Sequence, residues 1–269
     1  MKKKIKFKSF DGTNLVGILT IPNGKIKAAF LLVHGIPSDK DEWGFYKDLT
    51  FFLEENQIAS FRFDFRYNGE SQKGKFKNLT ISALLNDIES AFWQLRNSFT
   101  EDLALYVVGT SCGGGILIKW LNSFKRPIKK AFLMAPVLDY MFEVAGKEKA
   151  HFVDKFSTLT DEDLIKIKKT GVLNEDVGYG IGMLNEANIF DIKDEFNNCH
   201  IPIHIFHGKD DTIVPIDITL RSISDYDNIK LTEIPKANHG FAVEGDDDLT
   251  HPDTKANHFF IYKKILKSI

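Results

Sequence analysis

The hydrophobic and polar residues of the chain follow a strand-like pattern in some stretches and a helical pattern in others. Apolar and polar side chains alternate over residues 3–10 and 14–21, on either side of Asp11-Gly12, which predicts an antiparallel hairpin at a sheet edge. Residues 28–33 are instead continuously apolar, as in a strand buried on both faces. Further strands are predicted at residues 58–65, 105–109, 130–135, 201–206 and 229–234.

Helical patterns separate these strands along most of the chain. They cover approximately residues 43–55, 80–96, 116–121 and 258–266. This alternation is typical of a doubly wound α/β fold, so we expect a mostly parallel, eight-stranded sheet with helices on both faces. In such a sheet the reactive groups lie at the carboxyl ends of the strands.

One segment breaks this alternation. Residues 140–189 contain only a short helical pattern at 161–169 and a glycine-rich stretch. A structureless loop of this length is uncommon inside a domain, so we predict a cap or lid inserted after the sixth strand. The core then consists of residues 1–139 and 190–269.

The aromatic residues of this insertion are candidates for two roles. They could line an apolar pocket that binds the substrate, or they could hold the cap onto the core. The candidates for substrate contacts are Tyr140, Phe142 and Tyr179, and Phe152 and Phe156 belong to the same set.

Composition and charge narrow the class of protein. A formal net charge of −2 argues against nucleic acid as a partner, because binding phosphates needs a strongly basic surface. The basic start, Met1 to Lys4, leads into an alternating pattern rather than the apolar core of a signal peptide, and no apolar run is long enough to span a membrane. We therefore expect a cytoplasmic protein. Its two cysteines, Cys112 and Cys199, are too few for a disulfide framework or a cysteine zinc site.

Residues 105–121 predict a strand that turns at once into a helix, with Ser111 at the turn. Residues 109–113 read Gly-Thr-Ser-Cys-Gly and match the pattern G-x-S-x-G. Such a turn strains the serine backbone by about 1–3 kcal/mol and leaves little room for side chains two residues away. It also directs the N–H of Cys112, at the positive end of the helix, toward a developing oxyanion. Ser111 is therefore the candidate nucleophile; the alternative is a glycine-rich turn with an incidental serine.

A serine nucleophile needs a base, and the base needs an acid to orient it. Two loops that follow predicted strands supply these groups. The loop after residues 201–206 contains Asp210 and Asp211, and the loop after the last strand contains His239. Both loops leave the sheet at the edge where Ser111 is expected.

These segments, with His34-Gly35 and residues 64–71, resemble the α/β-hydrolase superfamily in the right order along nearly the whole chain. The resemblance implies the α/β-hydrolase fold, His239 as the base and Asp211 as the acid. It also implies that the N–H of Ile36 is a second oxyanion donor besides that of Cys112. Asp210 and, after the sixth strand, Asp139 are alternatives for the acid.

Other polar residues near these motifs are expected to have supporting roles. His34 is predicted to shape the oxyanion loop rather than to act as a base. His207 is predicted to be a buried, hydrogen-bonded histidine. Asp64 and Arg66 are predicted to form a structural ion pair near the site.

Within the superfamily the chain is most similar to small bacterial carboxylesterases of the cinnamoyl or feruloyl esterase type and to monoacylglycerol-lipase-like enzymes. This resemblance implies a serine carboxylesterase that acts on a small-molecule ester, without a metal or an organic cofactor. Departures from the usual residues at Thr110, Cys112 and Tyr67 leave the substrate open, with aromatic-acid and monoacylglycerol esters as candidates.

Several alternatives remain for the function. Thioesterase, acyltransferase and prolyl-oligopeptidase-like peptidase activities use the same groups. A non-catalytic small-molecule receptor is the alternative from another class. The edge hairpin of residues 3–21 could also mediate a homodimer.

Overall fold

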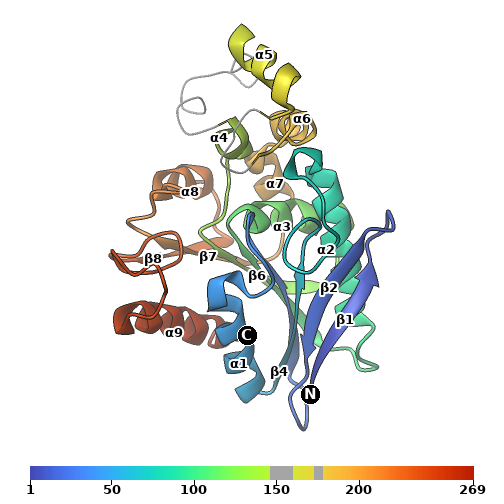
Figure 1. Cartoon of the computed structure of the whole chain (residues 1–269). Helices are drawn as coiled ribbons and strands as arrows, with labels where there is room; N and C mark the ends of the chain where they lie inside the picture. Colours follow the sequence, from blue (N-terminus) through green and yellow to red (C-terminus); the bar gives the residue numbers. More distant parts are fainter. Residues whose placement is uncertain (146–159, 173–177) are drawn as a thin grey trace.

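The computed structural model describes residues 1–145, 160–172 and 178–269. Its described strands form one eight-stranded sheet in the order β1-β2-β4-β3-β5-β6-β7-β8 (Figure 1). The β1–β2 and β2–β4 pairs are antiparallel, and the other neighbours are parallel. The predicted α/β-hydrolase sheet is therefore confirmed. The strands are β1 Lys2–Lys8, β2 Asn14–Thr20, β3 Ala28–Val33, β4 Ile58–Asp64, β5 Ala104–Thr110, β6 Ile128–Met134, β7 Ile203–Gly208 and β8 Ile229–Ile234.

Helices cover both faces of the sheet (Figure 1). On one face, α1 (Phe45–Glu55) and α9 (Pro252–Leu266) contribute apolar side chains to one core cluster. On the other face, α2 (Ile81–Arg96), α3 (Ser111–Phe124) and α7 (Ile192–Asn198) contribute to a second cluster. The strand β3 is buried along its whole length, as its unbroken apolar run predicts. Burial of both faces fixes the carboxyl edge of the parallel strands as the surface where loops can form a site.

In the described part of the predicted insertion, β6 is followed by the helices α4 (Tyr140–Ala145), α5 (Asp161–Thr170) and α6 (Ile181–Ile189). The predicted helix at residues 161–169 is confirmed as α5, which begins with a capping box between Thr160 and Asp163. The carboxylate of Glu186 on α6 accepts hydrogen bonds of 2.8 and 2.9 Å from the backbone and hydroxyl of Ser82, so α6 is tied to the start of α2. That this insertion is a cap stays a prediction, and Phe152 and Phe156 lie outside the described residues.

The remaining short elements connect this framework. The helix α8 (Ile216–Ile223) follows the loop after β7, and the 3-10 turns η1 (Glu42–Gly44) and η2 (Phe76–Asn78) precede α1 and α2. In the segments that the structure describes, no helix is both long and apolar enough to cross a membrane.

The predicted ion pair between Asp64 and Arg66 is wrong, because each side chain has a different partner. The guanidinium of Arg66 pairs with Asp87 at 2.6 Å and with Asp11 at 2.6 Å. Asp64 instead pairs with the buried Lys40 at 2.9 Å. The strand β4 ends at Asp64, so Arg66 lies in the turn beyond it, and the alternation of a strand no longer places the two side chains on one face.

The edge strand β1 bears on the predicted homodimer. Its lysines are exposed and alternate with half-buried Ile5 and Phe7. Lysines on an edge strand disfavour pairing with another chain. A homodimer through this hairpin stays a prediction.

Candidate active site

The turn between β5 and α3 holds Ser111 in a left-handed backbone conformation, with φ at 50°. This conformation is uncommon for a residue other than glycine and costs about 1–3 kcal/mol. The two flanking glycines are required by close backbone contacts. A Cβ at Gly109 would lie 2.8 Å from Cα of Gly114, and one at Gly113 would lie 2.2 Å from the carbonyl oxygen of His34. The strained elbow therefore presents the hydroxyl of Ser111 at the carboxyl edge of the sheet.

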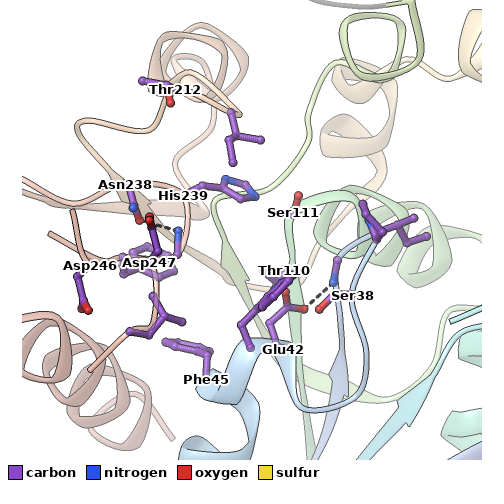
Figure 2. A pocket seen from close by; sticks show the side chains of 18 of the residues that line it. Ser38, Glu42, Phe45, Thr110, Ser111, Thr212, Asn238, His239, Asp246 and Asp247 are labelled. Carbon is purple, nitrogen blue, oxygen red and sulfur yellow. Dashed lines mark hydrogen bonds between the residues drawn. The ribbon is translucent and has the colours of Figure 1, made fainter. Parts of the chain in front are cut away.

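Asp211 and His239 form a hydrogen-bonded pair beside this elbow. Nδ1 of His239 lies 2.7 Å from Oδ2 of the buried Asp211. The backbone N–H groups of Ile213 and Val214 donate to Oδ1 of Asp211, both at 2.9 Å. Figure 2 shows the imidazole of His239 directed toward Ser111 across the same cavity. The carboxylate that contacts His239 is thus that of Asp211. The alternatives for the acid were Asp139 and Asp210, and Asp210 is exposed.

These contacts set the charges of the pair. Burial opposes ionisation of Asp211, but hydrogen bonds from His207, His239 and Val214 outweigh it and hold the pKa of this carboxyl well below its usual range. Burial also opposes a charge on His239, yet the hydrogen bond and the charge of Asp211 raise the pKa of the imidazole. The negative charge of Asp211 therefore favours the protonated form of His239.

A second histidine, His207, contacts the same carboxylate, and the sequence analysis did not predict this contact. Nε2 of His207 lies 3.2 Å from Oδ2 of Asp211 and 2.8 Å from the carbonyl oxygen of Val214. Nδ1 of His207 lies 3.0 Å from the hydroxyl of Thr219. His207 is buried and hydrogen-bonded, as predicted. Its contact with Asp211 forms because the loop after β7 folds back toward the end of that strand. Only its position four residues before Asp211 hinted at this contact.

The loop after β3 brings Ile36 to the elbow. A Cβ at Gly35 would lie 3.1 Å from Cβ of Ser111, so this loop runs directly beside the candidate nucleophile. Nε2 of His34 accepts a hydrogen bond of 2.9 Å from the N–H of Phe65, which leaves the proton on Nδ1 to be donated to the carbonyl oxygen of Gly35 at 2.5 Å. Because the N–H and C=O of a trans peptide point in opposite directions, His34 also orients the N–H of Ile36.

Cys112 occupies the first turn of α3, immediately after the elbow. Its side chain is buried, and burial raises the pKa of its thiol to about 12. The hydroxyl of Tyr140 donates to the carbonyl oxygen of Cys112, and the hydroxyl of Tyr179 lies 3.7 Å from its sulfur. The side chain is therefore held in the core, and only the backbone N–H of Cys112 is available to a reaction at Ser111.

The cavity beside Ser111 has a volume of about 490 Å³, and most of its lining comes from the segments that follow β3, β7 and β8. Its apolar lining residues are Ile36, Pro37, Trp43, Phe45, Ile213, Phe241 and Leu249. Neither Tyr140 nor Tyr179 lines it, in contrast to the sequence prediction. Their rings are buried, and their hydroxyls contact Cys112 directly after the elbow. The side chain of Phe142 lies outside the described residues.

An eight-stranded α/β sheet with a strained serine elbow and a neighbouring histidine–aspartate pair defines an α/β hydrolase. Residues 24–169, more than half of the chain, match the model of the family described as serine aminopeptidase, S33, and the chain belongs to this family. The matched segment includes the loop after β3 and Ser111. It ends before Asp211 and His239.

Several solved structures share the fold. Est1E from Butyrivibrio proteoclasticus, with ferulic acid bound, is 21% identical and has a TM-score of 0.74, with 97% of this chain and 99% of Est1E covered. The α/β hydrolase domain-containing protein 10 from mouse is 16% identical with a TM-score of 0.71, over 99% of this chain and 100% of that protein. The esterase EaEST from Exiguobacterium antarcticum is 16% identical with a TM-score of 0.66, over 96% and 98%. The search of the curated proteins gave no significant match.

Proposed function

We propose that the protein is a serine carboxylesterase that hydrolyses small to medium carboxylic esters through an acyl-enzyme. The observation that carries this proposal is the 2.7 Å bond between Asp211 and His239, formed beside the strained Ser111 and open to the same cavity. A purely structural turn gains nothing from this strain, whereas a nucleophile gains an exposed hydroxyl.

In the proposed mechanism His239 takes the proton of Ser111 as the hydroxyl oxygen attacks the ester carbonyl. The N–H groups of Cys112 and Ile36 stabilise the oxyanion, and each such donor is worth roughly 2.7–4 kcal/mol of the barrier. His239 then protonates the departing alcohol, which leaves the acyl group on Ser111. A water molecule activated by His239 releases the acid and restores the serine.

The cavity lining favours an apolar or aromatic acyl group. Trp43, Phe45 and Phe241 provide aromatic surfaces around the cavity. The fold likeness to Est1E, which was solved with ferulic acid bound, supports aromatic-acid esters as substrates to test first. The family description also supports a second candidate, an aminopeptidase that uses the same three residues on an amide.

The test is hydrolysis of a panel of chromogenic esters, from acetyl through medium-chain acyl to feruloyl, by wild type and Ser111→Ala. We expect wild type to cleave the esters, with Ser111→Ala at background. Matched aminoacyl anilides distinguish the aminopeptidase, because an esterase leaves them intact. If neither protein turns over any ester, thioester or amide, the proposal is wrong and the fold serves as a receptor.

A further inference from the structure

One buried carboxylate beside Ser111 has no place in the mechanism above. Glu42 lies at the end of the loop after β3 and is only 8% exposed. It lines the cavity together with Ser111 and His239, and Figure 2 shows all three around it. The groups that favour its ionised form are the N–H of Gly35, the hydroxyl of Ser38 and His239, and no lysine or arginine of the described residues is paired with it. A buried carboxylate without a cation is costly, so its retention calls for a role other than stability.

The backbone at Glu42 is strained, and this conformation places the carboxylate beside the N–H of Gly35. Glu42 has φ at 45° and Trp43 has φ at 53°, both in the left-handed region. The turn folds the side chain back across seven residues, so that Oε2 of Glu42 accepts a hydrogen bond of 2.6 Å from the N–H of Gly35. Strained residues that persist in this way cluster at functional sites.

Gly35 is thereby held at both of its polar groups. His34 donates to its carbonyl oxygen at 2.5 Å, and Glu42 accepts from its N–H at 2.6 Å. The same glycine separates Glu42 from the nucleophile, because a Cβ built on it would lie 3.1 Å from Cβ of Ser111 and 3.6 Å from Oε1 of Glu42. Any tilt of Gly35 would therefore move the adjacent N–H of Ile36 relative to Ser111.

We propose that Glu42 is a positioning residue for the reaction at Ser111. It fixes Gly35 so that the N–H of Ile36 points at the oxyanion, and its negative charge faces His239 and stabilises the imidazolium. This inference rests on the proposed function, since it assumes that Ser111 and His239 carry out the hydrolysis.

The electrostatics agree with this geometry. Burial raises the pKa of Glu42 to about 7, although the hydrogen bond from Gly35 opposes the shift. The titratable groups that face Glu42 are Asp39 in its own loop, Tyr46 on α1 and His239 in the loop after β8. In return, the charges of Glu42 and of Glu143 on α4 add to that of Asp211 in raising the pKa of His239. The charge on Glu42 thus influences the pH at which His239 becomes a base.

Two substitutions separate the hydrogen bond from the charge. Glu42→Gln keeps an oxygen for the N–H of Gly35 but removes the charge, whereas Glu42→Ala removes both. Asp48→Asn is the matched control, because it removes one exposed negative charge from α1, where Asp48 bonds Lys255 and not Gly35. The measurements are kcat, KM and the pH profile of kcat/KM on an ester that wild type cleaves.

For Glu42→Ala we expect kcat to fall about 10- to 100-fold with KM within about threefold, because the lost interaction acts on the oxyanion rather than on the bound ester. For Glu42→Gln we expect the plateau kcat to stay within about fivefold. Its acid limb should move about half a pH unit lower, because an imidazolium without the neighbouring anion loses its proton more easily. Asp48→Asn should match wild type in both respects.

An acid limb in Glu42→Gln that stays where wild type has it, together with an unchanged kcat in Glu42→Ala, overturns this inference. If Glu42→Ala does not fold by circular dichroism, the acid limb of Glu42→Gln decides alone. Failure of the proposed function is a separate result, since it appears either as no turnover by wild type or as full activity in Ser111→Ala.

Discussion

Oδ2 of Asp211 lies 2.7 Å from Nδ1 of His239, although 28 residues separate them in the chain. The two residues follow adjacent parallel strands, β7 and β8, whose carboxyl ends lie side by side. The sheet therefore brings the acid and the base together, and the buried hydrogen bond fixes the tautomer of the imidazole with its other nitrogen toward Ser111. This relationship leads to the first prediction.

Asp211→Asn should lower kcat on a cleaved ester by about 10³- to 10⁴-fold, because the amide no longer stabilises the imidazolium and can select the wrong tautomer. Asp210→Asn is the matched control, since Asp210 is the adjacent carboxylate and is exposed. It should retain activity within about twofold. A comparable loss in both variants would show that Asp211 has no special role.

The activity should depend on pH through His239. Because the pKa of His239 is raised, kcat/KM should fall as the pH drops through a value above the usual 6.5. The raised pKa of His239 stabilises the folded protein. This stabilisation is fully present below pH 6.5 and is lost as the pH rises through the pKa of His239 in the folded protein. The pKa of Asp211 is shifted in the opposite direction, below its usual value of 3.8. Its contribution to folding stability is therefore present above pH 3.8 and is lost only in stronger acid. Circular dichroism should therefore stay native across the acid limb; unfolding in that range would contradict the assignment to His239.

His207 should affect both stability and catalysis. His207→Asn removes the contact with Asp211 and the bonds to Val214 and Thr219, so we expect the free energy of unfolding to fall by about 1–3 kcal/mol and kcat to fall about tenfold. His204→Asn is the control, because His204 is buried on the same strand and bonds Thr232 at 2.8 Å instead. Urea unfolding should show a loss in both variants, while kcat should fall only in His207→Asn. Equal kcat values in the two would assign His207 to packing alone.

Trp43 should contribute to the binding of large acyl groups. It is 76% exposed and lines the cavity, so a bound acyl chain can bury it. Trp43→Ala should raise KM about three- to tenfold for feruloyl and medium-chain esters and leave acetyl esters within about twofold. Phe51→Ala, at an exposed aromatic residue of α1 that does not line the cavity, should change neither. An unaltered preference in Trp43→Ala would place the acyl site elsewhere.

Cys112 should be dispensable as a thiol. Its side chain is buried with a thiol pKa of about 12, and the proposed mechanism uses only its backbone N–H. Cys112→Ala should therefore keep kcat within about threefold, because the backbone donor remains. A loss greater than a hundredfold, with the fold intact by circular dichroism, would show that the sulfur takes part in the reaction.

The sequence by itself determined the sheet and the residues at its carboxyl edge. The unbroken apolar run at residues 28–33 predicted a strand buried on both faces, and β3 is one. The glycines at 109 and 113 predicted a strained turn at Ser111, which the positive φ and the close contacts of both glycines explain. These features are local: periodicity and turn chemistry depend on neighbouring residues, so the chain displays them without its fold.

Only the tertiary structure decided which polar residues meet and where the cavity lies. Asp64 and Arg66 are neighbours in sequence but pair with Lys40 and Asp87. The aromatic residues of the insertion gave no indication that Tyr140 and Tyr179 contact Cys112, and Glu42 gave none that it bonds Gly35. These contacts depend on backbone segments far apart in the chain and on the burial that results. Composition and periodicity specify neither, because a side chain's partners are fixed only when the core packs.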